Sequence, residues 1–151
     1  MFDEGMSDVV DVVSQLGLQP HPEGGWFRRI WTAPDELITP RGPRAVASSI
    51  LFLLEAGQRS RWHRVHGSQE LWLWLGGGRL ELQTAGTADR LGPQSGYHLG
   101  PVGVGATHHL VQADQWQRAR TLDDGWTLVS CVLSPEFDFQ DFELFDDGAT
   151  D

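Results

Sequence analysis

A chain of 151 residues is long enough to bury a hydrophobic core and short enough that a single domain is expected. Its net charge of -10 argues against nucleic acid and anionic membranes as partners, because an acidic surface repels phosphate groups. The only cysteine, Cys131, excludes an internal disulfide, and no apolar run approaches the ~20 residues that cross a bilayer. Because residues 1–8 lack the pattern of a signal peptide, we expect a cytoplasmic protein.

Frequent turns and one short helix are expected at the level of secondary structure. The 18 glycines and 8 prolines indicate a chain that reverses often, which favours an all-β fold. At the amino end Ser7 can cap a helix that Gly17 can end, and four apolar residues fall on one face of it: Val9, Val12, Val13 and Leu16. We therefore expect a helical segment over residues 1–17, a barrel over 18–145 and an acidic tail over 146–151.

Short apolar or aromatic runs between turn residues predict a series of strands. The expected strands are residues 26–32, 48–55, 61–65, 70–75, 79–84, 108–112, 116–120 and 126–133. Residues 85–107 hold many glycines and prolines and are expected to form a long loop or weak strands.

One strand alternates between two apolar faces. From residue 70 to 75, Glu70, Trp72 and Trp74 share one face, while three leucines share the other. Both faces are therefore expected to be buried, with the acidic and aromatic face lining a cavity.

The densest polar cluster lies just before that strand. If His63 and Arg61 face the same interior as Glu70, then an imidazole, a guanidinium and a carboxylate meet beside Trp72 and Trp74. A histidine and a carboxylate can move a proton near neutral pH, and arginine can bind an anionic group. The alternative is that the tryptophans are core residues and the arginines balance an acidic surface.

Four blocks of the chain, in order, resemble the signature of the cupin-5 family, long labelled a domain of unknown function. They are His21-Pro-Glu-Gly-Gly-Trp-Phe-Arg28, Ser60-Arg-Trp-His-Arg64 with Glu70-Leu-Trp72, Val111-Gln-Ala-Asp-Gln-Trp-Gln117, and Ser130-Cys-Val-Leu-Ser-Pro-Glu-Phe-Asp-Phe139. The resemblance implies a double-stranded β-helix, which is a cupin jelly-roll barrel, with a pocket for a small molecule and assembly into a homodimer. Through these blocks Arg28, Trp26 and Gln117 join the expected ligand contacts. Glu23 is expected mainly to shape a turn at the barrel mouth and is kept as a further ligand contact.

Metal-binding cupins use three histidines and one glutamate. Matching His63 and Glu70 to that pattern leaves Val65 and Gln117 where two further histidines would stand. We therefore expect no tightly bound metal and no other cofactor, and only weak metal binding through His63, Glu70 and Gln117 as an alternative.

The leading hypothesis is an acid/base enzyme of the epimerase, isomerase or dehydratase type that acts on a polar or anionic metabolite. His63 would be the general acid or base, Glu70 would tune it, and Arg61 or Arg28 would hold an anionic group. Two alternatives stay open: a sensor or carrier that binds a ligand without changing it, and a metal-dependent oxygenase or isomerase. The buried thiol of Cys131 and the phenylalanines at 137, 139, 142 and 145 are expected to serve packing.

Overall fold

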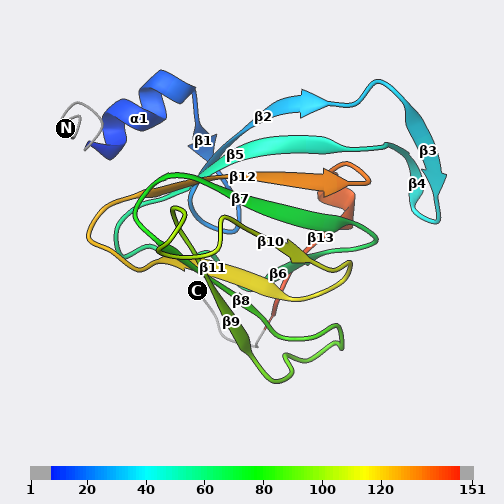
Figure 1. Cartoon of the computed structure of the whole chain (residues 1–151). Coiled ribbons are helices and arrows are strands. Elements are labelled where there is room, and N and C mark those ends of the chain that lie inside the picture. Colours follow the sequence, from blue (N-terminus) through cyan, green and yellow to red (C-terminus); the bar gives the residue numbers. More distant parts are fainter. Residues whose placement is uncertain (1–7, 147–151) are drawn as a thin grey trace.

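The computed structural model describes residues 8–146. Two β-sheets face each other, and among the described residues one α-helix packs on the outer side of the larger sheet, while a short 3-10 helix, Phe139–Asp141, precedes the last strand (Figure 1). The strands follow in the order β1 (Gln19–Pro20), β2 (Trp26–Thr32), β3 (Glu36–Thr39), β4 (Gly42–Ala45), β5 (Ser48–Leu54), β6 (His63–Val65), β7 (Gln69–Gly77), β8 (Leu80–Thr84), β9 (Ser95–Leu99), β10 (His108–Val111), β11 (Gln117–Thr121), β12 (Thr127–Ser134) and β13 (Phe142–Leu144). This confirms the all-β cupin architecture expected from the sequence.

The larger sheet has the order β1-β2-β5-β12-β7-β10, and the smaller has the order β13-β6-β11-β8-β9. The described pairings within both sheets are antiparallel. Neighbours in each sheet are often far apart in the sequence, as β12 lies between β5 and β7. Such crossing connections bring residues 63, 70 and 117 into one interior.

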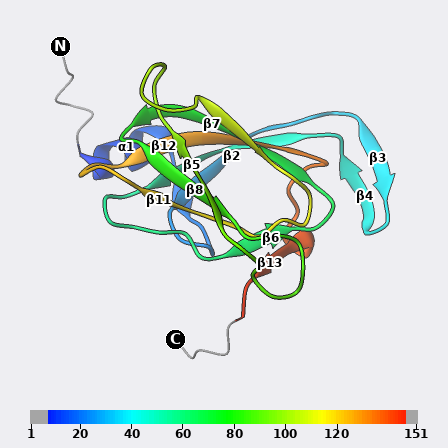
Figure 2. The ribbon, with the colours of Figure 1, turned by 60° about the horizontal axis from the view of Figure 1, so that its bottom comes forward.

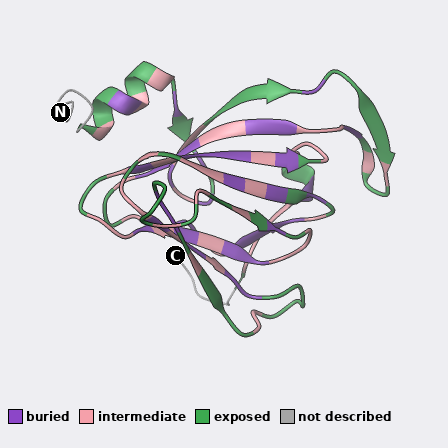
Figure 3. Cartoon of the chain, in the orientation of Figure 1, coloured by how far each residue is buried: buried purple, intermediate pink, exposed green. Residues whose placement is uncertain are grey.

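The main hydrophobic core fills the space between the two sheets (Figure 3). Its buried residues come from both sides, for example Phe52, Trp72 and Leu133 from the larger sheet and Leu82 and Ala119 from the smaller. The period-two pattern of the strands explains this arrangement, because alternate side chains of each strand point into the same core.

Helix α1 (Val9–Leu16) forms as the spacing of its apolar residues predicts. Asp8 caps it by accepting a hydrogen bond from the amide of Val10, and Gly17 ends it in the left-handed conformation at φ 68°. The expected cap, Ser7, lies outside the described residues. The apolar face packs with Leu18 and Leu53 on the outer side of the larger sheet.

The prediction that both faces of β7 are buried is wrong for its leucine face. Leu71 and Leu73 are partly exposed, and Leu75 is 49% exposed. The reason is that α1 packs on the part of the outer face formed by Leu51, Leu53 and Leu128, not on β7.

The list of expected strands lacks β1, β3, β4, β9 and β13, although weak strands were allowed within residues 85–107. Residues 85–107 contain a regular strand, β9, which pairs with β8. Strands β3 and β4 were not expected; they form a separate hairpin that projects from the two main sheets (Figures 1 and 2). Among the described residues, no helix has the length and apolar character needed to span a bilayer.

Candidate functional site

A small cavity of about 20 Å³ lies between the two sheets. Four of its lining residues are ionisable: His21, Glu23, His63 and Glu70. The others are apolar: Phe27, Ile50, Val65, Leu133, Phe137 and Phe142. The expectation that His63 and Glu70 face one enclosed space is therefore met by the structure, with exposed fractions of 2% and 7%.

A hydrogen bond to the backbone fixes the tautomer of His63. Its Nδ1 lies 2.8 Å from the carbonyl oxygen of Arg61, which can only accept, so Nδ1 carries the proton and donates it. Nε2 of the ring lies 3.3 Å from Oε1 of Glu23. Burial lowers the pKa of His63 to about 4, so the imidazole is neutral at neutral pH.

Glu23 occupies the centre of the site, in the turn between β1 and β2. Burial raises its pKa well above the usual range, the charge of Glu70 raises it further, and a hydrogen bond with Ser60 opposes both effects. Burial thus favours the neutral, protonated form of Glu23, whose carboxyl group lies next to Nε2 of His63. The directions of both pKa shifts favour a Glu23–His63 pair without net charge.

His21 supports this turn. Its Nδ1 accepts a hydrogen bond from the backbone amide of Glu23 at 3.1 Å, and its own amide donates to the carbonyl oxygen of Gly25 at 2.9 Å. Burial, with a smaller effect from His63, lowers the pKa of His21 to about 3. Gly25 has φ 83°, and a Cβ atom there would lie 2.7 Å from the carbonyl oxygen of Leu53, so only glycine fits the turn.

Glu70 forms a second proton-binding group. Gln117 donates to its Oε1 at 2.8 Å, and the thiol of Cys131 also hydrogen bonds with it. Burial raises the pKa of Glu70 to about 7, and these two hydrogen bonds oppose the rise. Glu70 can therefore gain or lose a proton near neutral pH, which suits a general acid or base.

A segment rich in phenylalanine closes the cavity. Residues 135–142, which we call the closing segment, place Phe137, Phe139 and Phe142 around the ring of His21, with ring centroids 5.7 to 6.2 Å away. The space that remains is enough for about one water molecule, so a metabolite can enter only if this segment moves.

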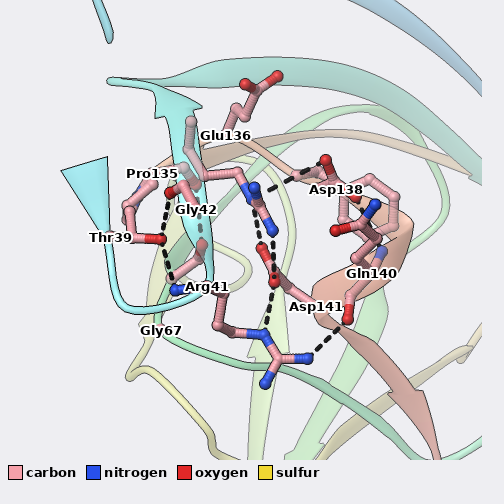
Figure 4. A network of polar contacts seen from close by, with 12 residues as sticks. Thr39, Arg41, Gly42, Gly67, Pro135, Glu136, Asp138, Gln140 and Asp141 are labelled. Atoms are coloured by element: carbon pink, nitrogen blue, oxygen red, sulfur yellow. Dashed lines mark hydrogen bonds and ion pairs between the residues drawn. The ribbon is translucent and has the colours of Figure 1, made fainter. Parts of the chain in front are cut away.

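Ion pairs hold the closing segment against the projecting hairpin (Figure 4). Arg44 of β4 binds both carboxylate oxygens of Asp141, at 2.9 and 3.0 Å, and Arg41 adds a contact of 2.7 Å. Glu136 accepts from the amide of Ala45 at 2.6 Å and from Arg29 at 3.0 Å. The segment is thus fixed at both of its ends.

A larger hollow of about 520 Å³ lies beside the hairpin rather than between the sheets. Leu37, Ile38 and Pro40 form its apolar wall, and Arg41, Arg44, His66, Asp114 and Asp141 supply its charges. These charged groups pair with one another or with Glu143. The buried groups with shifted pKa values gather in the small cavity and not in this hollow, which makes the small cavity the candidate site.

Several side chains expected at the ligand lie elsewhere. Arg61 is exposed, and only its backbone amide reaches the site, where it donates to the carbonyl oxygen of Glu23. Arg28 is exposed and donates to the carbonyl oxygen of Leu16 at the end of α1. No arginine lines the cavity, so the structure provides no clamp for an anionic group there.

The three tryptophans also lie outside the cavity lining. Trp26 donates to Glu55 and packs with the helix, and Trp74 donates to the carbonyl oxygen of Gly78. Trp72 is buried and donates its indole N–H to Gln117, so it supports Glu70 indirectly. The indoles are held by these packing and hydrogen-bond contacts and do not form the expected stacking surface.

Sequence reasoning underrated Glu23 and missed His21. It assigned Glu70 to tune His63, whereas the carboxyl group beside His63 is that of Glu23. Both residues lie in a turn, where no periodicity signals the direction of a side chain. The block from His21 to Arg28, which resembles the family signature, contains both His21 and Glu23 and was the signal that could have identified them.

The expected weak metal set does not fit this geometry. Gln117 would ligate through its amide oxygen, but that oxygen accepts the indole N–H of Trp72 at 2.9 Å and the amide nitrogen faces Glu70. Among residues 8–146, no group of three or more histidine, cysteine or acidic side chains is arranged to hold a metal ion.

Comparison with known proteins identifies the relatives of this chain. The model of the Cupin_5 family, described as Cupin superfamily (DUF985), matches residues 10–145. Protein SO0799 from Shewanella oneidensis is 31% identical, with a TM-score of 0.80 over 93% of this chain and 86% of that one. A hypothetical protein from Leishmania major is 25% identical, with a TM-score of 0.80 over 91% of this chain and 86% of the other.

More distant structures share the fold alone. A dTDP sugar isomerase from Desulfovibrio desulfuricans is 11% identical, with a TM-score of 0.60 over 82% of this chain and 85% of that one. None of the curated proteins matches the chain.

Proposed function

Because the chain belongs to the Cupin_5 family of the cupin superfamily, we propose that it is an enzyme that transfers protons on a small molecule bound between its two sheets. The reaction class is epimerisation, isomerisation or dehydration beside a carbonyl group. The observation that carries the proposal is the presence of two separate proton carriers, the Glu23–His63 pair and Glu70, in the lining of one closed cavity.

The two carriers are suited to opposite roles in the same step. With its pKa raised to about 7, Glu70 is partly ionised at neutral pH and can remove a proton from a carbon next to the carbonyl. The electron pair of that C–H bond forms a C=C bond while the π electrons of the carbonyl group move to its oxygen, which takes the proton of the Glu23–His63 pair. In a hydroxycarbonyl substrate, the hydroxyl group of the first carbon then returns a proton to the pair, and Glu70 gives its proton to the former carbonyl carbon, which completes an isomerisation and restores the protein.

The closed cavity favours this chemistry. The phenylalanines of the closing segment exclude water, which strengthens hydrogen bonds inside and protects a reactive enol. Opening and closing of residues 135–142 would then accompany each turnover. The lining holds no arginine, so the proposed substrate group near the carriers is a neutral carbonyl rather than an anion.

The dTDP sugar isomerase resembles this chain in fold only. The proposed chemistry is therefore inferred from the residues that line the cavity and not from that enzyme. The cytoplasmic location and the homodimer expected from the sequence remain predictions, and the proposed reaction does not depend on either.

Exchange of substrate hydrogen with solvent tests the proposal. The protein is incubated in heavy water with a panel of sugars, sugar nucleotides and small hydroxycarbonyl compounds, and deuterium uptake at carbon is followed by NMR. We expect catalysed exchange on one compound class, reduced about 10²- to 10⁴-fold by Glu70→Gln and by His63→Asn. Gln83→Met is the control, because Gln83 pairs with Arg118 away from the cavity.

The same experiment separates the proposal from its main alternative. A compound that raises the melting temperature but exchanges no hydrogen would indicate a sensor or carrier. Exchange that persists unchanged in both Glu70→Gln and His63→Asn would overturn the assignment of the two carriers.

A further inference from the structure

A chain of hydrogen bonds crosses the interior from one sheet to the other. Trp72 on β7 donates its indole N–H to Oε1 of Gln117 on β11 at 2.9 Å, and Gln117 donates through Nε2 to Oε1 of Glu70 at 2.8 Å. Trp72 and Gln117 are 1% and 2% exposed. The chain is therefore shielded from solvent along its length.

The direction of this chain is fixed by chemistry. An indole nitrogen can donate but cannot accept, so the oxygen of the Gln117 amide must face Trp72. The amide nitrogen must then face Glu70. If the amide turned over, it would place two donors against each other and two acceptors against each other, and both hydrogen bonds would be lost.

Gln117 is also placed next to the other proton carrier. In the antiparallel pair β6–β11, Gln117 lies directly opposite His63, and directly opposite residues present their side chains on the same face. Gln117 therefore stands beside His63 on its own sheet and binds Glu70 on the facing sheet.

We infer that Trp72 and Gln117 are positioning residues that hold Glu70 as a hydrogen-bond acceptor in the cavity beside His63. The inference rests on the proposed function, because it gives the pair a role in preparing one of the two proton carriers. Neither residue lines the cavity, so both act through Glu70 and not by touching a ligand.

The groups that surround Glu70 determine how its pKa should respond to the loss of the Gln117 amide. From β12 the thiol of Cys131 hydrogen bonds with Glu70, from the β1–β2 turn comes Glu23, whose own pKa is raised by burial and by the charge of Glu70, and from β6 comes His63, whose pKa is lowered. The donor on Gln117 stabilises the ionised form of Glu70. Without that donor, the effect of burial on the pKa of Glu70 is opposed less strongly. Glu70 should then keep its proton to a higher pH.

The test reads Glu70 directly, so it needs no substrate. Protein with ¹³C-labelled glutamate is titrated by NMR, with Glu70 assigned by its absence in Glu70→Gln. We expect Gln117→Met, which keeps the length of the side chain without the amide, to raise the pKa of Glu70 by about 1. Trp72→Phe should raise it by a smaller amount in the same direction, because Gln117 is then free to turn its oxygen toward Glu70.

Controls separate positioning from packing. Gln83→Met makes the same change on β8, where the amide binds Arg118, and it should leave Glu70 unchanged. Trp72→Phe keeps an aromatic ring in the core and serves if Gln117→Met does not fold. A fall in melting temperature with no change in the titration of Glu70 would overturn the inference.

This outcome is independent of the exchange experiment. Altered titration of Glu70 without any exchanging substrate would support the positioning role and count against the proposed reaction. Exchange of substrate hydrogen together with an unaltered titration of Glu70 would support the proposed reaction and count against the positioning role.

Discussion

Nε2 of His63 lies 3.3 Å from Oε1 of Glu23, although His63 belongs to the smaller sheet and Glu23 to a turn between two strands of the larger one. Glu23 reaches this position from the turn that leads into β2, and the backbone amide of Arg61 donates to its carbonyl oxygen. The contact joins the turn to the strand that carries His63. It defines the buried, uncharged pair on which the proposed chemistry depends.

Glu70→Gln should change the pH dependence of stability. The pKa of Glu70 is about 7 in the folded protein against an ordinary value of 4.5, so folding takes up a proton between these pH values. The contribution of Glu70 to stability is therefore complete below pH 4.5 and is lost as the pH rises to 7. Relative to the native chain, Glu70→Gln should gain about 3 kcal/mol between about pH 4 and pH 8, measured by denaturant unfolding.

The buried histidines change the stability with pH in the opposite direction, but they are present in both proteins. Comparing Glu70→Gln with the native chain at the same pH therefore cancels their contribution. Glu36→Gln removes an exposed carboxylate on β3 and shows the effect of one surface charge. A constant difference between Glu70→Gln and the native chain over the whole range would show that Glu70 is not desolvated as described.

Gly25→Ala should destabilise the protein more than Gly67→Ala does. Both glycines have positive φ, 83° and 80°, so alanine is strained at either position. A Cβ atom at Gly67 meets nothing within 4 Å, whereas at Gly25 it lies 2.7 Å from a backbone oxygen. We expect a loss of roughly 1–2 kcal/mol at Gly67 and about 3 kcal/mol or more at Gly25, from thermal or denaturant unfolding. Equal losses would show that the turn carrying Glu23 is not tightly packed.

Arg44→Met should release the closing segment. Asp141 is buried, and its carboxylate would lose both contacts with Arg44 and keep its contact with Arg41. We expect faster hydrogen–deuterium exchange of amides in residues 135–142, with little change in β8 or β11. Arg79→Met breaks a more exposed pair with Asp123 and is the control. Unchanged exchange in the closing segment of Arg44→Met would contradict the role given to this ion pair.

The thiol of Cys131 should resist modification while the protein is folded. It is 1% exposed, and burial raises its pKa well above the usual range. A thiol reagent should label it only after unfolding in denaturant, and the ratio of the two rates is measured by mass spectrometry. Rapid labelling of the folded protein would place Cys131 at an open surface and argue against a closed cavity.

Much of the architecture could be predicted because it depends on local patterns. Strand β2 matches its expected residues, and the spacing of Val9, Val12, Val13 and Leu16 predicted the packing face of α1. The alternation in β7 correctly placed Glu70 on the inner face. These features follow from the period of a helix or strand, which one short segment reveals.

The site was harder to predict because it depends on contacts between distant segments. Arg44 and Asp141 form an ion pair although they lie far apart in the sequence, and no local sequence pattern near either residue predicts the other as its partner. Strands β3 and β4 were missed because their residues include Pro43 and lack a clear alternation of apolar side chains. Arg61 was expected in the cavity because residues two apart on a strand share a face with each other, but β6 begins only at His63, so the alternation does not extend to Arg61.

Site-resolved NMR titration of the Glu23–His63 pair tests the central claim most directly. With ¹⁵N-labelled histidine and ¹³C-labelled glutamate, we expect neutral His63 with its proton on Nδ1 at neutral pH, charging only near pH 4, and a Glu23 carboxyl group that titrates well above its ordinary value of 4.5. If His63 instead titrates near its ordinary value of 6.5 and Glu23 near 4.5, the two groups are open to water, and the buried uncharged pair on which the account depends does not exist.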